Sequence, residues 1–176
     1  PERAMLQGWL DWHRQTLLHK CTGLTADQLR EASAPPSNLT LLGLVRHMTD
    51  VERSWFTLRA AGRTEAGSVH ISDDNIDGDF DDIAGADAQA DFAAYTTELT
   101  ASDEAVGGFA LDHEFTHRDK TISLRWVYHH MIEEYARHKS PLTVQGNRYN
   151  GGLHGLLASL VVEHHKHRYP NRCHNP

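Results

Sequence analysis

The chain has few cysteines, no excess of basic residues and no long apolar run. Its two cysteines, Cys21 and Cys173, form no C-x-x-C pair and cannot build a disulfide framework. The net charge is −7 with histidine counted as neutral. This balance argues against nucleic acid as a partner, because phosphates need a basic face. No apolar stretch approaches the roughly 18 residues of a membrane span, so we expect no contact with a membrane.

The composition is that of one soluble globular domain spanning residues 1–176. A hydrophobic fraction of 39% in 176 residues is enough for a sizeable core. The first residues, Pro-Glu-Arg-Ala, lack the basic and apolar regions of a secretory signal. We therefore expect a cytoplasmic protein. The chain holds fourteen histidines, about three times average usage, and most of them cannot be ligands of one site.

Helical spacing of apolar residues predicts four long helices. The first has an inner stripe of Leu6, Leu10, His13 and Leu17, and the second has one of Leu44, Met48, Val51, Trp55 and Leu58. We expect the helices at residues 5–20, 41–61, 87–102 and 124–138. The sequence therefore predicts an all-α four-helix bundle with long connections.

Turn and cap signals divide the connections. Thr25 is expected to cap a short helix within 22–40, and Thr40 is one of the residues able to cap the second long helix. Residues 109–121 are interpreted as a connection. Lys139-Ser-Pro141 is expected to interrupt or end the last helix, because proline cannot donate to the helical ladder.

The connection at 63–86 is rich in Asp, Gly and Ser. From Asp73 it begins like a calcium-binding loop, but the Glu that completes such a loop is missing. We interpret the segment as a solvated surface loop, long enough to serve as a lid or a partner surface.

Two charged residues break the apolar stripe of the last helix. Leu124, Val127, Met131, Glu134 and His138 follow one another at steps of three and four. A buried carboxylate is costly unless it takes a proton or finds a cation. Spacing of four residues places Glu134 and His138 on one face, and a divalent metal would satisfy both.

His47 is the candidate third ligand. It lies at the edge of the inner stripe of the second helix, one turn before Val51. A single histidine in such a place is more often a hydrogen-bonded core residue than a ligand. Together with Glu134 and His138 it would give a metal three protein ligands and leave a position open, as catalytic sites do. Zinc suits this set best, and nickel or another transition metal also accepts it.

Two segments resemble the signature segments of DinB-like (YfiT-like) metal-binding four-helix bundles. They are LLGLVRHMTDVERSWF at 41–56 and SLRWVYHHMIEEYARH at 123–138. The chain is most similar to an actinobacterial branch of unknown function that is related to mycothiol-dependent maleylpyruvate isomerase and to the bacillithiol and mycothiol S-transferases. The resemblance spans about 5–140. After His138 the chain departs from the pattern of the branch, and 141–176 is a divergent, His-rich segment.

The resemblance implies an up-down-down-up bundle with a divalent metal bound by His47, Glu134 and His138. His130, one turn before Glu134, is a candidate partner of these ligands or a substitute for one. The resemblance also implies transfer of a mycothiol-like thiol to an electrophilic small molecule, since a thiol bound to metal loses its proton. An external thiol makes neither cysteine necessary as a nucleophile.

Two other functions fit the same residues. Water in the open position would give a metal-activated hydrolase. A metal that only balances buried charge would leave a non-catalytic metal-binding bundle or dimerisation module. Trp9 and Trp12 on the first helix leave a homodimer open.

Overall fold

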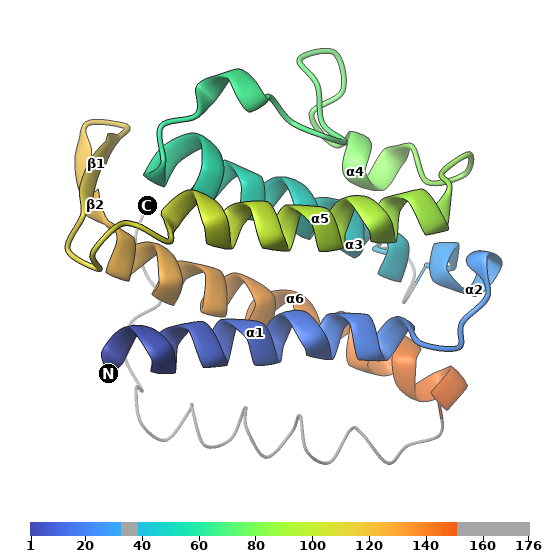
Figure 1. Ribbon diagram of the computed structural model, residues 1–176. Coiled ribbons are helices and arrows are strands. Elements are labelled where there is room, and N and C mark those ends of the chain that lie inside the picture. The colour runs from blue at the N-terminus through green and yellow to red at the C-terminus, as the bar shows by residue number, and fades with distance from the viewer. Residues whose placement is uncertain (33–38, 151–176) are drawn as a thin grey trace.

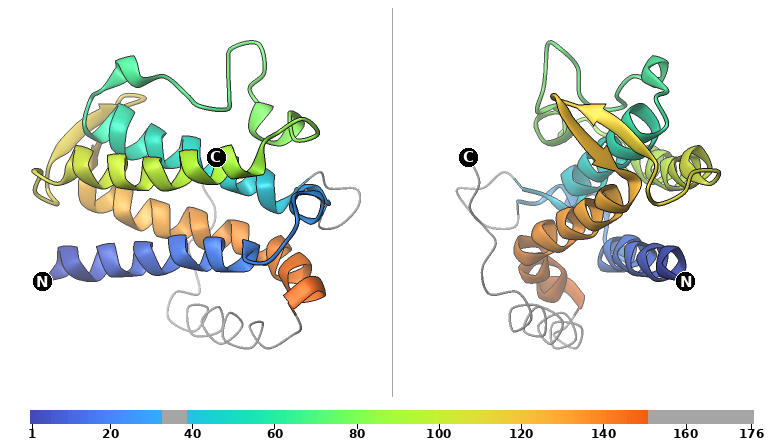
Figure 2. Two further views of the ribbon diagram at one scale, coloured as in Figure 1. Left: turned by 45° about the vertical axis from the view of Figure 1, so that its right-hand side comes forward. Right: turned by 90° about the vertical axis from the view of Figure 1, so that its left-hand side faces the viewer.

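The protein folds as a four-helix bundle in a computed structural model that describes residues 1–32 and 39–150. The long helices are α1 (Glu2–Cys21), α3 (Leu41–Glu52) continued by η1 (Arg53–Ala60), α5 (Ala88–Val106) and α6 (Leu124–Asn150). In Figure 1, α1 and α6 run in one direction, and α3 and α5 run in the other. Figure 2 shows α1 beside α6 and α3 beside α5. The predicted all-α bundle and its up-down-down-up order are confirmed.

The expected helix starts are confirmed by their caps. Thr25 forms a capping box with Gln28 at the start of α2 (Ala26–Arg30), and the Thr40 hydroxyl accepts a hydrogen bond from the Gly43 N–H at the start of α3. Asp87 caps α5 in the same way. These signals are local, because a side chain here bonds backbone groups two or three residues away.

A small β-hairpin, which the predicted all-α bundle does not include, occupies part of the connection 109–121. Strands β1 (Glu114–His117) and β2 (Lys120–Ser123) pair in antiparallel fashion at the end of the bundle where α6 begins. The turn residues Arg118 and Asp119 have φ values of 50° and 61°. A two-residue hairpin turn of type I′ needs positive φ at both central residues, and glycine or asparagine usually signals it. Arg-Asp carries no such signal.

Helix α6 continues through Pro141 to Asn150, so the expected interruption at Lys139-Ser-Pro141 is wrong. A proline removes one hydrogen bond of the ladder and crowds the preceding turn, which weakens a helix without always ending it. Residues 151–176 lie outside the described residues. None of the described helices has the length and apolar character needed to cross a membrane.

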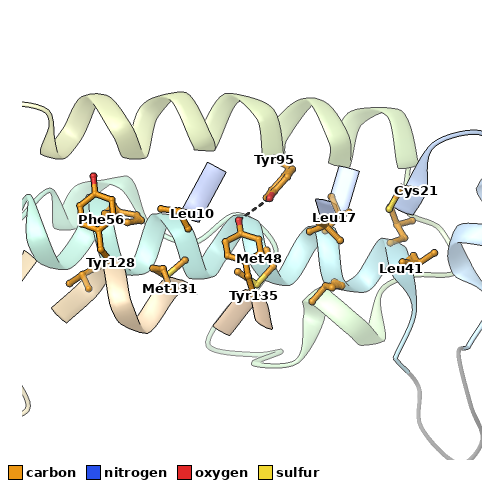
Figure 3. Packing of buried hydrophobic residues seen from close by; sticks show 14 of the residues in the cluster. Leu10, Leu17, Cys21, Leu41, Met48, Phe56, Tyr95, Tyr128, Met131 and Tyr135 are labelled. Carbon is orange, nitrogen blue, oxygen red and sulfur yellow. Dashed lines mark hydrogen bonds between the residues drawn. The ribbon is translucent and has the colours of Figure 1, made fainter. Parts of the chain in front are cut away.

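The bundle core includes the expected stripe of α1 and the first half of the stripe of α3 (Figure 3). Further along, the expectation fails: Glu52 and Phe56 are buried where Val51 and Trp55 were expected. The buried face has already moved to Glu52 at the end of α3, before the π-helical turns of η1 begin at Arg53. On α6 the buried position is Tyr135, and Glu134 lies at the edge of the stripe.

The connection 63–86 is only partly a solvated loop. It contains η2 (Thr64–Ala66), a 3-10 turn, and α4 (Gly78–Asp81), and the latter packs against α3. Gly78, Asp79, Ile83 and Ala86 are buried. The Asp-rich composition hid this contact, because charged residues usually indicate exposure.

Candidate metal centre

The structure brings His47, Glu134 and His138 together from two helices. The His47 and His138 rings lie 4.9 Å apart between centroids. Glu134 Oε2 lies 3.4 Å from His138 Nε2. The three side chains are 25%, 13% and 26% exposed, so they sit at the rim of the core and are open to a small ligand.

Glu134 is paired with three cationic or potentially cationic groups. Arg137 Nη1 donates to Glu134 Oε1 at 2.7 Å, and His130 Nε2 lies 3.8 Å from the same oxygen. The hydrogen bond from His138 lowers the pKa of the Glu134 carboxyl, and Arg137 adds to this against the effect of burial. The carboxylate is therefore ionised at neutral pH. The spacing of the sequence suggests that it needs a metal to balance its charge, but in the structure it already has partners within the protein.

His47 has a partner that the sequence argument missed. Its Nδ1 lies 2.7 Å from Oδ2 of Asp79, whose side chain is 6% exposed. A carboxylate has no proton to give, so Nδ1 carries the shared proton, and Nε2 is left available as a ligand. The sequence could not find this pair, because nothing in the spacing distinguishes Asp79 from its neighbouring aspartates.

The donor types of His47, Glu134 and His138 suit a metal, although the three side chains do not converge on one point in the structure. Two imidazoles and a carboxylate are normal zinc ligands. Among the described residues, no group of three or more His, Cys, Asp or Glu is arranged to hold a metal ion. Glu134 is directed at Arg137 and the flanking histidines, and binding a metal would require it to exchange these contacts.

An aromatic cluster adjoins the site on its hairpin side. His130 stacks on Trp126 at 4.7 Å and meets Trp55 edge-on at 4.6 Å. Arg59 lies over the Trp55 ring, and His117 of β1 also contacts that ring. Burial lowers the pKa of His130 despite the nearby Glu134. His130 is therefore neutral near pH 7 and can accept or share a proton.

Cys21 is not equipped to act as a nucleophile. Its side chain is buried at the end of α1. Burial raises the pKa of the Cys21 thiol to about 12, which keeps it protonated at neutral pH. Cys173 lies outside the described residues.

Comparison with known proteins gives one match. A family model described as mycothiol-S-transferase matches residues 5–140. This range includes most of α1, all of α3, η1 and α5, and the part of α6 that carries Glu134 and His138. No curated protein and no solved structure matches the chain significantly. Because the family match covers most of the chain and both segments that carry His47, Glu134 and His138, the chain belongs to the mycothiol S-transferase family.

Proposed function

We propose that the protein is an enzyme that transfers a mycothiol-type thiol to an electrophilic small molecule, with a divalent metal bound by His47, Glu134 and His138. The observation that carries this proposal is the adjacency of these three side chains across α3 and α6 in a chain of this family. Zinc is the metal that best suits the donors, and nickel or another transition metal is the alternative.

A metal bound there would lower the pKa of a thiol in its open position and make it a thiolate near neutral pH. The protein side chains would hold and orient the reactants. Glu134 is ionised without further change, and Nε2 of His47 is available as a ligand. Neutral His130 lies beside Glu134, where it would steady that carboxylate or replace one ligand.

The nucleophile would come from the co-substrate. The high pKa of Cys21 and its burial make it unsuitable as the nucleophile, and a mycothiol-type thiol would supply the sulfur. In the reaction the thiol sulfur forms a bond to carbon of the electrophile. The leaving group departs with the electron pair of the broken bond, and the thiol proton passes to solvent or to a neighbouring base such as His130.

An assay with mycothiol and monochlorobimane tests this function. Protein stripped by a chelator and then reloaded with zinc should form the thioether at least 10-fold faster than stripped protein, with chloride released. Loss of thioether formation in the His47→Ala variant would tie the reaction to the site. Equal rates with and without metal would contradict the metal's role. Hydrolysis of an ester panel without thiol would favour the hydrolase.

A dimerisation module is the second candidate, because α1 exposes an apolar face. Met5, Trp9 and Trp12 are 54%, 48% and 41% exposed, and they border a shallow groove at Gly8. A second copy of the chain would bury this face. Stable zinc binding together with no thiol transfer to any of a panel of electrophiles would favour this reading over the enzyme.

A further inference from the structure

One face of α3 is devoted to holding the segment 69–82, which we call the strap. Gly43, Arg46, His47 and Asp50 follow one another at i, i+3, i+4 and i+7, so they share this face. Helix α4, which lies within the strap, packs against α3, and its Phe80 ring meets α3 at Gly43. A proposed metal ligand therefore lies in the middle of a docking face.

Two charged residues of this face bind the backbone of the strap. The Asp50 carboxylate accepts hydrogen bonds from the N–H groups of Val69 and His70 at 2.6 and 2.8 Å. Arg46 Nη2 donates to the carbonyl oxygen of Gly78 at 3.0 Å. Because these bonds reach backbone atoms, they fix the path of the strap independently of most of its side chains.

Close packing at Gly43 then sets the position of α4. A Cβ atom at residue 43 would come within 2.6 Å of Phe80 Cδ1, so only glycine allows this approach. The Phe80 ring in turn lies 5.4 Å from the His47 ring. The residue between Gly78 and Phe80, both of which α3 holds, is Asp79.

Asp79 delivers a buried carboxylate to one nitrogen of His47. The Nδ1 to Oδ2 distance is 2.7 Å, and the Asp79 side chain is 6% exposed. A buried carboxylate requires a donor, so the pair keeps a proton on Nδ1. Histidines that bind metals usually give their other ring N–H to such a group, which fixes the tautomer and the ring orientation.

We propose that Asp79 is a positioning residue, presented by the strap, that holds His47 as the Nδ1–H tautomer with Nε2 ready for a metal. Its effect on metal binding rests on the proposed function. The tautomer itself does not, because the Asp79 contact exists in the protein without metal. The strap would thereby act as a fixed support of the site, rather than as the solvated loop that its composition indicates.

Zinc affinity tests the effect on the site. Competition with a chromophoric chelator should give the Asp79→Asn and Asp79→Ala variants an affinity about 10- to 100-fold below that of the wild type. Asp81→Asn is the matched control, since Asp81 is exposed on the same helix, and it should bind zinc like the wild type. Unchanged affinity in both Asp79 variants would overturn the proposal, provided circular dichroism shows them folded.

The tautomer is measured without metal, by long-range ¹H–¹⁵N correlation of the imidazoles at pH 8. The wild type should show His47 with its proton on Nδ1, and Asp79→Ala should move His47 toward the Nε2–H form. A wild-type His47 with its proton on Nε2 would overturn the proposal. The predicted tautomer in a protein that binds no zinc would instead contradict the proposed metal site and leave the positioning role of Asp79 standing.

Discussion

Arg14 and Glu52 form an ion pair inside the bundle, and each of the two buried charges balances the other. Two hydrogen bonds of 2.8 and 2.7 Å join the guanidinium to a carboxylate that is 0% exposed. The Tyr135 hydroxyl donates to the same carboxylate at 2.7 Å. Glu52 is thus a fully buried carboxylate with partners on two helices, whereas Glu134 lies at the rim.

Removing Glu52 should destabilise the protein strongly, because Arg14 would keep a buried and poorly paired charge. We expect Glu52→Ala to lower the free energy of unfolding by about 3–5 kcal/mol. Asp103 pairs with the same arginine but is 43% exposed, so Asp103→Ala should cost no more than about 1 kcal/mol. Urea denaturation of both variants measures the difference. Similar losses in the two would contradict this account of the core.

His70 should make stability fall at mildly acidic pH. Burial lowers the pKa of this imidazole, and Arg46 lowers it further against the effect of Asp91 and Asp50. Between the folded and the unfolded pKa, the unfolded chain binds a proton that the folded chain does not. The contribution of His70 to the free energy of unfolding is therefore fully present above the pKa of the unfolded chain. It is lost as pH falls toward the lower pKa of the folded protein. Thermal melts at pH 8 to 5 should show a shallower loss for His70→Gln, and an identical loss would contradict the assignment.

At the scale of elements, the contact between α3 and α4 depends on the absence of a side chain at Gly43. An alanine Cβ would meet Phe80 at 2.6 Å and Thr40 Oγ1 at 3.0 Å. Gly43→Ala should therefore lower the free energy of unfolding by about 1–3 kcal/mol, as overpacking does. It should also weaken zinc binding, since it displaces the strap without touching a charged group.

Gly8 provides the matched control for this prediction. It also lies inside a helix, and a Cβ there would meet nothing within 4 Å. Gly8→Ala should stabilise the protein by about 0.5–1 kcal/mol through helix propensity alone. Calorimetry on the two variants should give opposite signs. Stabilisation by Gly43→Ala would show that α4 does not pack on α3 as described.

The sequence predicts elements well where the cause is local and poorly where it is not. The long helices and the caps Thr25 and Thr40 follow from spacing and from side chains next to the backbone they bond. The π-helical η1 has no such local signal in the sequence. The hairpin turn at Arg118 and Asp119 adopts positive φ without glycine, so its usual signal is absent.

The candidate site shows the same division. His47, Glu134 and His138 were predicted from their spacing, and the structure brings them together. The contact of His47 with Asp79 joins residues 32 positions apart in the chain. Only the folding of the strap onto α3 creates that contact, so no periodicity reports it.

At the scale of the whole molecule, the bundle order determines the site. The antiparallel arrangement of α3 and α6 places the early part of one helix beside the later part of the other, and this brings His47 near His138 (Figure 1). The homodimer stays a prediction, and sedimentation velocity of the wild type and of Trp9→Ser tests it. A wild-type monomer at every concentration would contradict it.

Metal content is the measurement that tests the central claim most directly. Protein purified without a histidine tag and loaded with zinc should retain one equivalent after dialysis, measured by mass spectrometry of the metal. His47→Ala and His138→Ala should retain none, and Glu134→Gln should bind more weakly. His129→Ala should behave like the wild type, since His129 is exposed on the same helix. A full equivalent of zinc in the His138→Ala protein would contradict the proposed site.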